Sequence, residues 1–180
     1  RVLFRSQLSS SSFGGWFSQL SGSLSTKARR PFSAAAQRTP LFALHQELKG
    51  KLTNYAGWEL PLMYEQSHLQ SHLHTRENAS IFDVSHMGQL YITGRDHLAF
   101  IEYILPGDMQ ALSTGYGRLS CITNERGGVI DDCVAFREKN GIFMVINAGC
   151  VEKDLEHIQF WGQNFRNRGK DVTIQIDRRY

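Results

Sequence analysis

The residues with the clearest potential for chemistry are two adjacent carboxylates, Asp131 and Asp132, in the stretch GGVIDDCVAF at positions 127–136. This stretch otherwise has the composition of a core strand, where carboxylates are rarely buried without a partner. Side chains alternate between the two faces of a strand, so the carboxylates should point to opposite sides. The smaller residues share the face of Asp131: Val129, Cys133 and Ala135. The bulkier ones share the face of Asp132: Ile130, Val134 and Phe136.

Two interpretations of this pair remain open from the residues alone. In the structural one, the carboxylates accept hydrogen bonds from the backbone of the hairpin or pair with Arg126 or Arg137. In the functional one, a carboxylate held among apolar side chains has a shifted pKa that suits it to binding or catalysis. Spacing alone favours the structural role for the pair, and Asp132 is the stronger functional candidate.

A cluster of histidines, HLQSHLH, places His68 and His72 four residues apart on one face of a predicted helix, with His74 nearby. Two histidines at this spacing can bind zinc, but the HExxH pattern is absent and no third ligand is evident. We therefore expect a polar, solvated helix face and no metal site.

Ser85 and His86 in FDVSHM have the residue types of a nucleophile and its base. Neighbours on an extended chain point to opposite faces, so these two cannot pair with each other. We expect His86 to be a structural histidine or part of a pocket wall. The chain also contains no GxGxxG or Walker sequence, and nucleotide binding therefore has no support.

The net charge of +3 is unevenly distributed along the 180 residues. Residues 1–38 hold six of the 20 Lys and Arg residues and no acidic residue, which leaves 14 basic against 17 acidic residues from Thr39 onward. The folded part is therefore mildly acidic, and we expect no nucleic-acid partner. No apolar run is long enough to span a membrane, and we expect no membrane partner either.

Residues 1–38 are rich in Ser and Arg and dotted with apolar side chains, the composition of a mitochondrial transit peptide. We predict a disordered leader here, with a matrix-processing site in RRPFSAAA, and a domain over 39–180. A Ser-rich tail and a plastid leader remain alternatives. Because the first residue is Arg1 rather than Met, we expect the chain to be incomplete at this end.

The remaining pattern predicts an α+β domain of antiparallel sheets with flanking helices. Expected helices cover 41–48, capped by Thr39, then 65–78, 96–105, capped by Asp96, and 151–165. Expected strands cover 51–56, 80–84, 89–93, 119–123, 129–136, 142–146 and 171–176, and a turn-like break covers 57–61. Three cysteines, Cys121, Cys133 and Cys150, are expected to be free apolar core residues in a reducing compartment.

Five segments together resemble, in order and spacing, the N-terminal part of the aminomethyltransferase family, the T-proteins of the glycine cleavage system. They are TPLFALHQEL, YAGWELPLMY, SHLHTRENASIFDVSHMGQL, TNERGGVIDDCVAF and VINAGCVEKDLEHI. FDVSHM and the GG..DD motif also occur in the folate-binding domains of sarcosine and dimethylglycine dehydrogenases. The opening TPL…H and AGWELP segments are more particular to the T-protein.

The resemblance implies a reaction in the mitochondrial matrix. A lipoylated H-protein presents an aminomethyl group, tetrahydrofolate takes the methylene as co-substrate, ammonia leaves, and dihydrolipoyl H-protein remains. No metal takes part.

The resemblance also implies the site residues. The second aspartate of the motif, Asp132, would lie at the folate nitrogens as the catalytic carboxylate, where it would orient the folate and stabilise iminium character. Four further positions would line the folate cavity: Met87, Leu119, Val145 and Asn147. Asp131 would help to position Asp132 without contacting the folate itself.

The chain ends where the family's proteins are less than half complete, before their GYTGE segment, their Arg-Asp helix and their C-terminal barrel. We therefore expect an incomplete T-protein fold, with the activity belonging to the complete protein and the segment alone inactive. Alternatives are a non-catalytic folate-binding relative in iron–sulfur assembly, a domain related to the two dehydrogenases, and a remnant that cannot bury its core.

Overall fold

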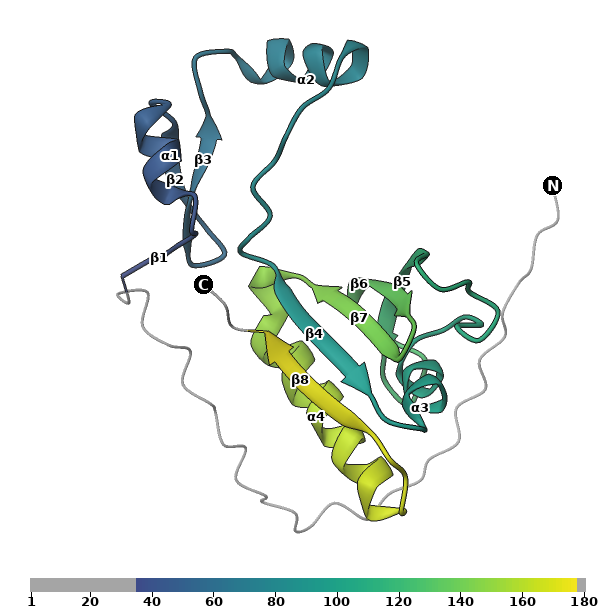
Figure 1. Cartoon of the computed structure of the whole chain (residues 1–180). Coiled ribbons are helices and arrows are strands. Elements are labelled where there is room, and N and C mark those ends of the chain that lie inside the picture. Colours follow the sequence, from purple (N-terminus) through teal and green to yellow (C-terminus); the bar gives the residue numbers. More distant parts are fainter. Residues whose placement is uncertain (1–34, 178–180) are drawn as a thin grey trace, which may run out of the picture. The chain divides into compact units, whose positions relative to one another are not determined.

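The protein, described here from a computed structural model of residues 35–177, contains two β-sheets and four α-helices within that range (Figure 1). A three-stranded sheet has the order β1-β3-β2, and a five-stranded sheet has the order β5-β6-β7-β4-β8. Every strand pair is antiparallel except β1 with β3, so the predicted α+β class is confirmed. The predicted leader lies outside the described residues except for positions 35–38, of which Gln37 and Arg38 form β1.

The bounds of the elements follow the predicted pattern closely over the second half of the chain. The strands are β1 Gln37–Arg38, β2 Lys51–Tyr55, β3 Trp58–Met63, β4 Gly88–Thr93, β5 Gly117–Thr123, β6 Val129–Glu138, β7 Gly141–Ile146 and β8 Thr173–Asp177. The helices are α1 Phe42–Glu47, α2 His68–Glu77, α3 His97–Ile104 and α4 Val151–Asn167, with a 3₁₀ turn, η1, at Ala148–Cys150.

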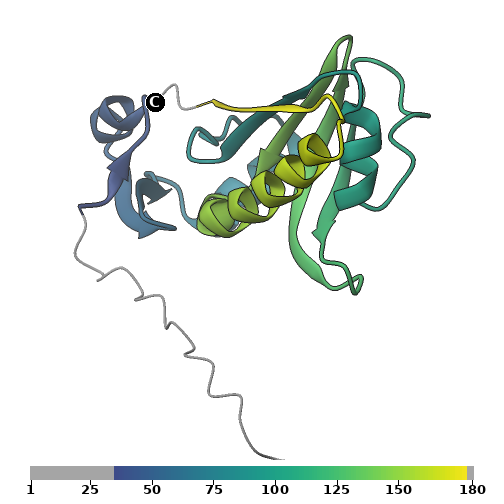
Figure 2. The same ribbon diagram turned by 90° about the horizontal axis from the view of Figure 1, so that it is seen from below.

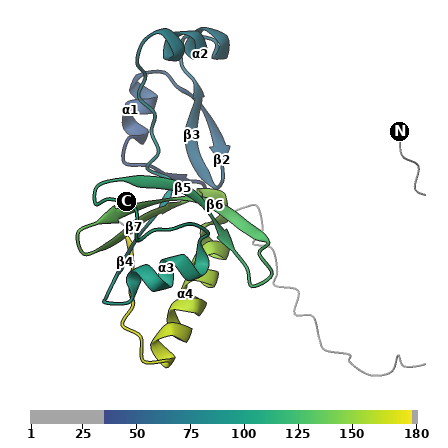
Figure 3. The same ribbon diagram turned by 90° about the vertical axis from the view of Figure 1, so that its right-hand side faces the viewer.

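The hydrophobic core lies between one face of the five-stranded sheet and the helices α3 and α4, which cover that same face (Figures 2 and 3). Alternate residues of the strands supply one side of it: Leu90, Ile92, Ile122, Cys133, Ala135, Ile142, Met144 and Ile146. Across from them, Phe100 of α3 meets Phe165 of α4 edge to face, with ring centroids 5.2 Å apart. The apolar residues of α4 form one stripe, and their spacing in the sequence is sufficient to predict this helix.

A hairpin replaces the predicted break at 57–61. Ala56 and Gly57 have φ of 52° and 86°, the left-handed pair that a two-residue hairpin turn requires, and Tyr55 pairs directly with Trp58. Pro61 lies within β3 opposite Leu52, where the register shifts. The prediction of a break is wrong because an irregular register tolerates a residue without an N–H.

The segment before β4 is held by side chains rather than by strand pairing, so the strand predicted at 80–84 is wrong. The carboxylate of Asp83 accepts a 2.7 Å hydrogen bond from Thr39 Oγ1 and lies 2.8 Å from His45 Nε2. Burial alone would raise the pKa of Asp83, but hydrogen bonds from Ser85, His45 and Thr39 outweigh it and hold the pKa well below its ordinary value. Thr39 therefore anchors this segment, and its predicted role as the cap of α1 is wrong.

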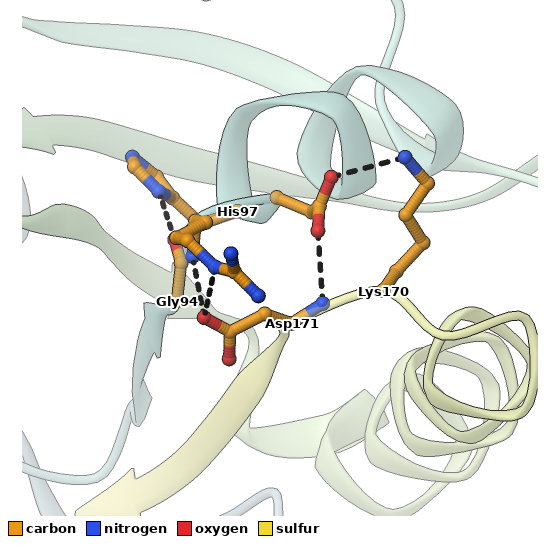
Figure 4. A network of polar contacts seen from close by, with 6 residues as sticks. Gly94, His97, Lys170 and Asp171 are labelled. Atoms are coloured by element: carbon orange, nitrogen blue, oxygen red, sulfur yellow. Dashed lines mark hydrogen bonds and ion pairs between the residues drawn. The ribbon is translucent and has the colours of Figure 1, made fainter.

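A second polar network joins the turn after β4 to the turn before β8 (Figure 4). The Asp96 carboxylate accepts hydrogen bonds from the Asp171 amide at 2.9 Å and from Lys170 Nζ at 3.2 Å. Asp171 in turn accepts from the Arg95 amide and guanidinium, at 3.1 and 3.2 Å. Asp96 occupies the N-cap position of α3 but makes no side-chain cap bond, so its predicted capping role is wrong. The Asp96 carboxylate instead accepts hydrogen bonds from Lys170 and Asp171, which lie 74 and 75 residues further along the chain.

The helix α2 begins with a capping box, in which the Ser67 hydroxyl accepts from the Gln70 amide. None of its residues is buried, so the predicted solvated face for His68 and His72 is confirmed. Among residues 35–177, no helix is long and apolar enough to cross a membrane. The three cysteines are free, as predicted, although only Cys133 is fully buried.

Candidate functional site

The face of the five-stranded sheet opposite α3 and α4, which is the upper face of that sheet in Figure 3, is the candidate site. Register partners on neighbouring strands share a face, and Leu119 of β5, Val134 of β6 and Val145 of β7 are direct partners in one row across the sheet. In the next row, Cys121 is the partner of Asp132. Leu119, Asp132 and the pair Val145 and Asn147, which come from three separate segments of the chain, thereby lie close together.

The side-chain amide of Asn147 links both aspartates. Its Nδ2 donates to Asp132 Oδ1 at 2.7 Å and to Asp131 Oδ1 at 3.2 Å, with a longer contact of 3.4 Å to the backbone carbonyl of Asp132. Asn147 precedes η1 but makes no cap hydrogen bond there, which leaves its side chain available for the carboxylates. The three residues form one hydrogen-bonded group where the first half of β6 lies beside the end of β7.

Asp131 and Asp132 point to opposite sides of the sheet, as strand alternation predicts, but their environments differ from the expectation. Asp132 is exposed, whereas Asp131 points toward the core and is half-buried. Bulky neighbours do not identify the inner face, because the positions of α3 and α4 decide which face is covered. The face of Asp131, with the smaller Cys133 and Ala135, is the one they cover.

A β-bulge lies directly before the aspartates. The register shifts so that Ile122 pairs with Asp131 and Thr123 with Val129, which leaves Ile130 as the extra residue. Ile130 packs against the core, while Val129 is 67% exposed, so their predicted faces are reversed. The bulge thus sets which side of the sheet each carboxylate of the GGVIDD motif reaches.

Behind Asp131 lies Asp154, in the first turn of α4 and 0% exposed. Asp131 and Asp154 are close enough for each to act on the pKa of the other, and Cys150 also acts on the pKa of Asp131. Burial would raise the pKa of Asp131, but hydrogen bonds involving Asn147, Asp154 and Cys150 outweigh it and leave the pKa below its ordinary value. Burial and the adjacent Asp131 raise the pKa of Asp154 to about 7.

Sequence reasoning misses Asp154, although a signal is present. The apolar stripe of α4 passes through Val151, Leu155 and Ile158, and a residue three positions after Val151 must lie on the same stripe. An acid at such a position is buried against the core and needs a partner. That partner, Asp131, is identified only by the packing of α4 over the strand β6.

Part of the open face is an apolar platform, formed by Leu119, Val134, Phe136, Phe143 and Val145. Leu119 is 71% exposed, and Phe143 contacts Tyr91 and Phe136 at centroid distances of 5.0 and 6.0 Å. Gly117 underlies the ring of Phe136, because a Cβ at Gly117 would lie 2.4 Å from that ring. An exposed carboxylate beside such a platform can bind a flat heterocycle and accept hydrogen bonds from its N–H groups.

Met87 lies just before β4, whose first residue Gly88 is the partner of Ile146. Extending this antiparallel register by one residue places Met87 opposite Asn147, at the edge of the same group. Ser85 donates its amide to Asp83, and His86 packs edge to face on Tyr55 at 5.7 Å. Burial lowers the pKa of His86, and its Nδ1 has no hydrogen-bond partner among the described residues. As predicted, Ser85 and His86 do not pair with each other.

Comparison with known proteins gives one family and a consistent set of relatives. Residues 41–177 match the family described as GCVT N-terminal domain. The chain is 42% identical over 152 residues to the mitochondrial aminomethyltransferase of Dictyostelium discoideum, and 43% identical over 151 residues to that of Homo sapiens. Each match covers 82% of this chain and 38% of the relative.

Among solved structures, the chain is similar to the crystal structure of glycine cleavage system aminomethyltransferase T from Bartonella henselae. The TM-score is 0.68 at 30% sequence identity, and the match covers 78% of this chain and 38% of that one. The chain therefore spans about 38% of the length of the relatives it matches.

Proposed function

Since the chain belongs to the family of the GCVT N-terminal domain, we propose that the protein carrying it transfers an aminomethyl-derived methylene to tetrahydrofolate in glycine cleavage. The observation that carries the proposal is the exposed Asp132 carboxylate, fixed by Asn147 at 2.7 Å beside an apolar platform. The relatives compared above are named aminomethyltransferases, which supports this enzyme over a non-catalytic relative in iron–sulfur assembly or a domain of the dehydrogenase type.

The platform suits the flat ring of a reduced pterin. Leu119 and Val145 would cover a ring face, and Met87 would close the edge next to Asn147. Tetrahydrofolate carries N–H groups at the nitrogens that receive the one-carbon unit, and a carboxylate accepts hydrogen bonds from such donors. Asp132 is the exposed carboxylate next to the platform, so we propose that it accepts hydrogen bonds from the folate nitrogens.

In the proposed reaction the aminomethyl carbon loses its bonds to the lipoyl sulfur and to the amine nitrogen and becomes bonded to two folate nitrogens. The folate nitrogens give up two protons, of which one ends on the lipoyl thiol and the other on the departing amine. Positive charge develops on the carbon–nitrogen unit in the course of transfer. The role of Asp132 is to orient the folate and to stabilise that charge, and the role of Asn147 is to hold the Asp132 carboxylate in one orientation.

The partner in this reaction would be the lipoylated H-protein, which delivers the aminomethyl group. A mitochondrial location is supported by the names of the relatives, and we extend it to the matrix because glycine cleavage takes place there. Residues 1–38 would serve as the import leader.

The proposal is tested by the reaction itself in the complete protein that carries this chain. Aminomethyl-loaded H-protein and tetrahydrofolate are supplied, and ammonia and methylenetetrahydrofolate are measured. We expect both products to form in equal amounts and only when folate is present. Ammonia release at the same rate with and without folate, or an unaffected rate in Asp132→Asn, would overturn the assignment.

A further inference from the structure

Two carboxyl groups, those of the completely buried Asp154 and the half-buried Asp131, lie beneath the site on the core side of β6. Both carboxyl oxygens of Asp154 and Oδ2 of Asp131 are buried and receive no hydrogen bond from any N–H or O–H donor among residues 35–177. Each of these two carboxyl groups nevertheless shifts the pKa of the other through a side-chain hydrogen bond, which places their unpartnered oxygens next to each other. Two carboxylates are both acceptors only, so this contact is stable only if one of them keeps its proton.

The surroundings decide which carboxyl is protonated. Asp131 receives a hydrogen bond from Asn147, and both Asn147 and Cys150 lower its pKa, which stabilises its ionised form. Asp154 has neither and is completely buried. Its position in the first turn of α4 favours a negative charge, and so does Lys153, but Lys153 Nζ is bound to the Ile130 carbonyl at 2.7 Å.

Other titratable groups around Asp154 do not favour its ionisation. They are Asp131, Asp132 and Cys133 from β6, and Cys150 from η1 acts on the neighbouring Asp131. Burial raises the pKa of the Cys133 thiol to about 12, and burial also raises that of Cys150, so neither supplies a charge at neutral pH. Among the described residues that most strongly affect the pKa of Asp154, Lys153 is the cation.

We infer that Asp154 is a positioning residue, an acid that stays protonated, donates to Asp131 and so holds Asn147 in place on Asp132. The chain of contacts is continuous from Asp154 to Asp131, to Asn147 at 3.2 Å, and to Asp132 at 2.7 Å. When Asp154 ionises, the pair carries two negative charges, and the amide of Asn147 is drawn toward Asp131 and away from Asp132. The inference about the proton stands alone, and only its effect on transfer rests on the proposed function.

Asp154→Asn is the informative variant, because an amide donates to Asp131 at every pH. Asp154→Leu removes the donor and fills its place in the core with an apolar side chain. Glu138→Gln, at the exposed far end of β6, is the matched control. Circular dichroism establishes that each variant of the full chain is folded before it is compared.

The first readout is independent of activity. In the wild-type chain, we expect an infrared band of a protonated carboxyl group near neutral pH, and a side-chain amide resonance of Asn147 that shifts as this band disappears at higher pH. The band and the pH-dependent shift of the Asn147 resonance should both persist in Glu138→Gln, and both should be absent in Asp154→Asn. A wild-type chain without the band, or an Asn147 resonance that shifts equally in Asp154→Asn, would overturn the inference.

The second readout is the rate of transfer in the complete protein. We expect Asp154→Asn to keep the wild-type rate below neutral pH and to lack the wild-type decline above it. Asp154→Leu should lose about tenfold or more at all pH values with KM for folate little changed. If the spectroscopic results hold but wild-type protein transfers nothing, the proposed function fails and the proton assignment remains. If transfer is normal but follows the same pH profile in Asp154→Asn, the positioning role fails.

Discussion

The side-chain amide of Asn147 lies 2.7 Å from Oδ1 of Asp132, and this bond joins the end of β7 to the middle of β6 on the uncovered face of the sheet. Asn147 also contacts Asp131, which points to the opposite side. One amide thus connects an exposed carboxylate to the carboxyl pair on the core side of β6. The geometry makes the two aspartates of the GGVIDD motif unequal, and this inequality has consequences for activity, for stability and for their dependence on pH.

Asn147→Ala should reduce transfer more than it reduces stability. The variant leaves Asp132 free to rotate, and losing one oriented polar group in a site costs about 10²-fold in rate. The lost hydrogen bonds should lower the free energy of unfolding by about 1–2 kcal/mol. Rates and urea unfolding are measured side by side, with Asn140→Ala in the exposed β6–β7 turn as the control. An unchanged rate would remove Asn147 from the site.

Asp132→Asn and Asp131→Asn should separate function from folding. Asp132 is exposed, so its replacement should change the free energy of unfolding by no more than about 0.5 kcal/mol while transfer falls by about 10²-fold or more. Asp131→Asn alters the contact with buried Asp154 and should cost about 1–3 kcal/mol. Equal losses of stability in both variants would return the pair to a purely structural role.

The stability of the fold should depend on the protonation of Asp154. Its pKa is raised from an ordinary value of 3.8 to about 7, so the folded state binds the proton more tightly than the unfolded state does. This contribution is fully present below about pH 4 and is lost as the pH rises through 7.

Asp154→Asn should therefore gain stability relative to wild type between about pH 4 and pH 7, by at most about 4 kcal/mol, with no further gain above. Urea unfolding of both chains at a series of pH values measures the difference. The Asp131 carboxyl, with its lowered pKa, acts in the opposite direction but below pH 4, outside this window. A difference that is flat from pH 4 to pH 7 would contradict the raised pKa.

Leu119→Ser should weaken folate binding without unfolding the chain. Leu119 is 71% exposed on the platform, so a polar replacement costs little in the fold but removes apolar contact area for a bound ring. We expect the KM for tetrahydrofolate to rise about tenfold, equivalent to about 1.4 kcal/mol. Leu69→Ser on α2, where Leu69 is 68% exposed, is the matched control and should leave KM unchanged. The same increase in both variants would show that the platform is not the folate site.

Gly94→Ala should destabilise the fold through the network of Figure 4. Gly94 has φ of +105°, and an added Cβ would lie 2.3 Å from the backbone oxygen of Asp171, which cannot move without breaking its 3.0 Å bond from Asp96. We expect a loss of about 3 kcal/mol in the free energy of unfolding. Gly127→Ala shares the positive φ but has no atom within 4 Å, and should cost only about 1 kcal/mol. Equal costs would mean that backbone conformation alone explains Gly94.

The sequence by itself determined the class of the fold and most of its second half. Alternation along 129–136 and 142–146 and the apolar stripe over 151–165 are local patterns, each set by the period of one element. They predict β6, β7 and α4 closely, and strand alternation alone is enough to place Asp131 and Asp132 on opposite faces. The motifs supply the family resemblance, and with it the residues that the sheet brings together. The errors at Thr39 and Asp96 have one origin, since each local signal is overridden by a partner far along the chain, whereas the error at residues 57–61 comes from the irregular register of the neighbouring strand.

Only the tertiary structure decided which face of the sheet is covered, and therefore which aspartate is exposed. Strand periodicity assigns residues to two faces but does not say where α3 and α4 pack, and the bulge at Ile130 cannot be read from the pattern. The contact between Asp131 and Asp154 joins a strand to a helix 23 residues further on, so no local period could reveal it. Burial is a property of the assembled layers, and it is burial that makes Asp154 an acid with a pKa near neutrality.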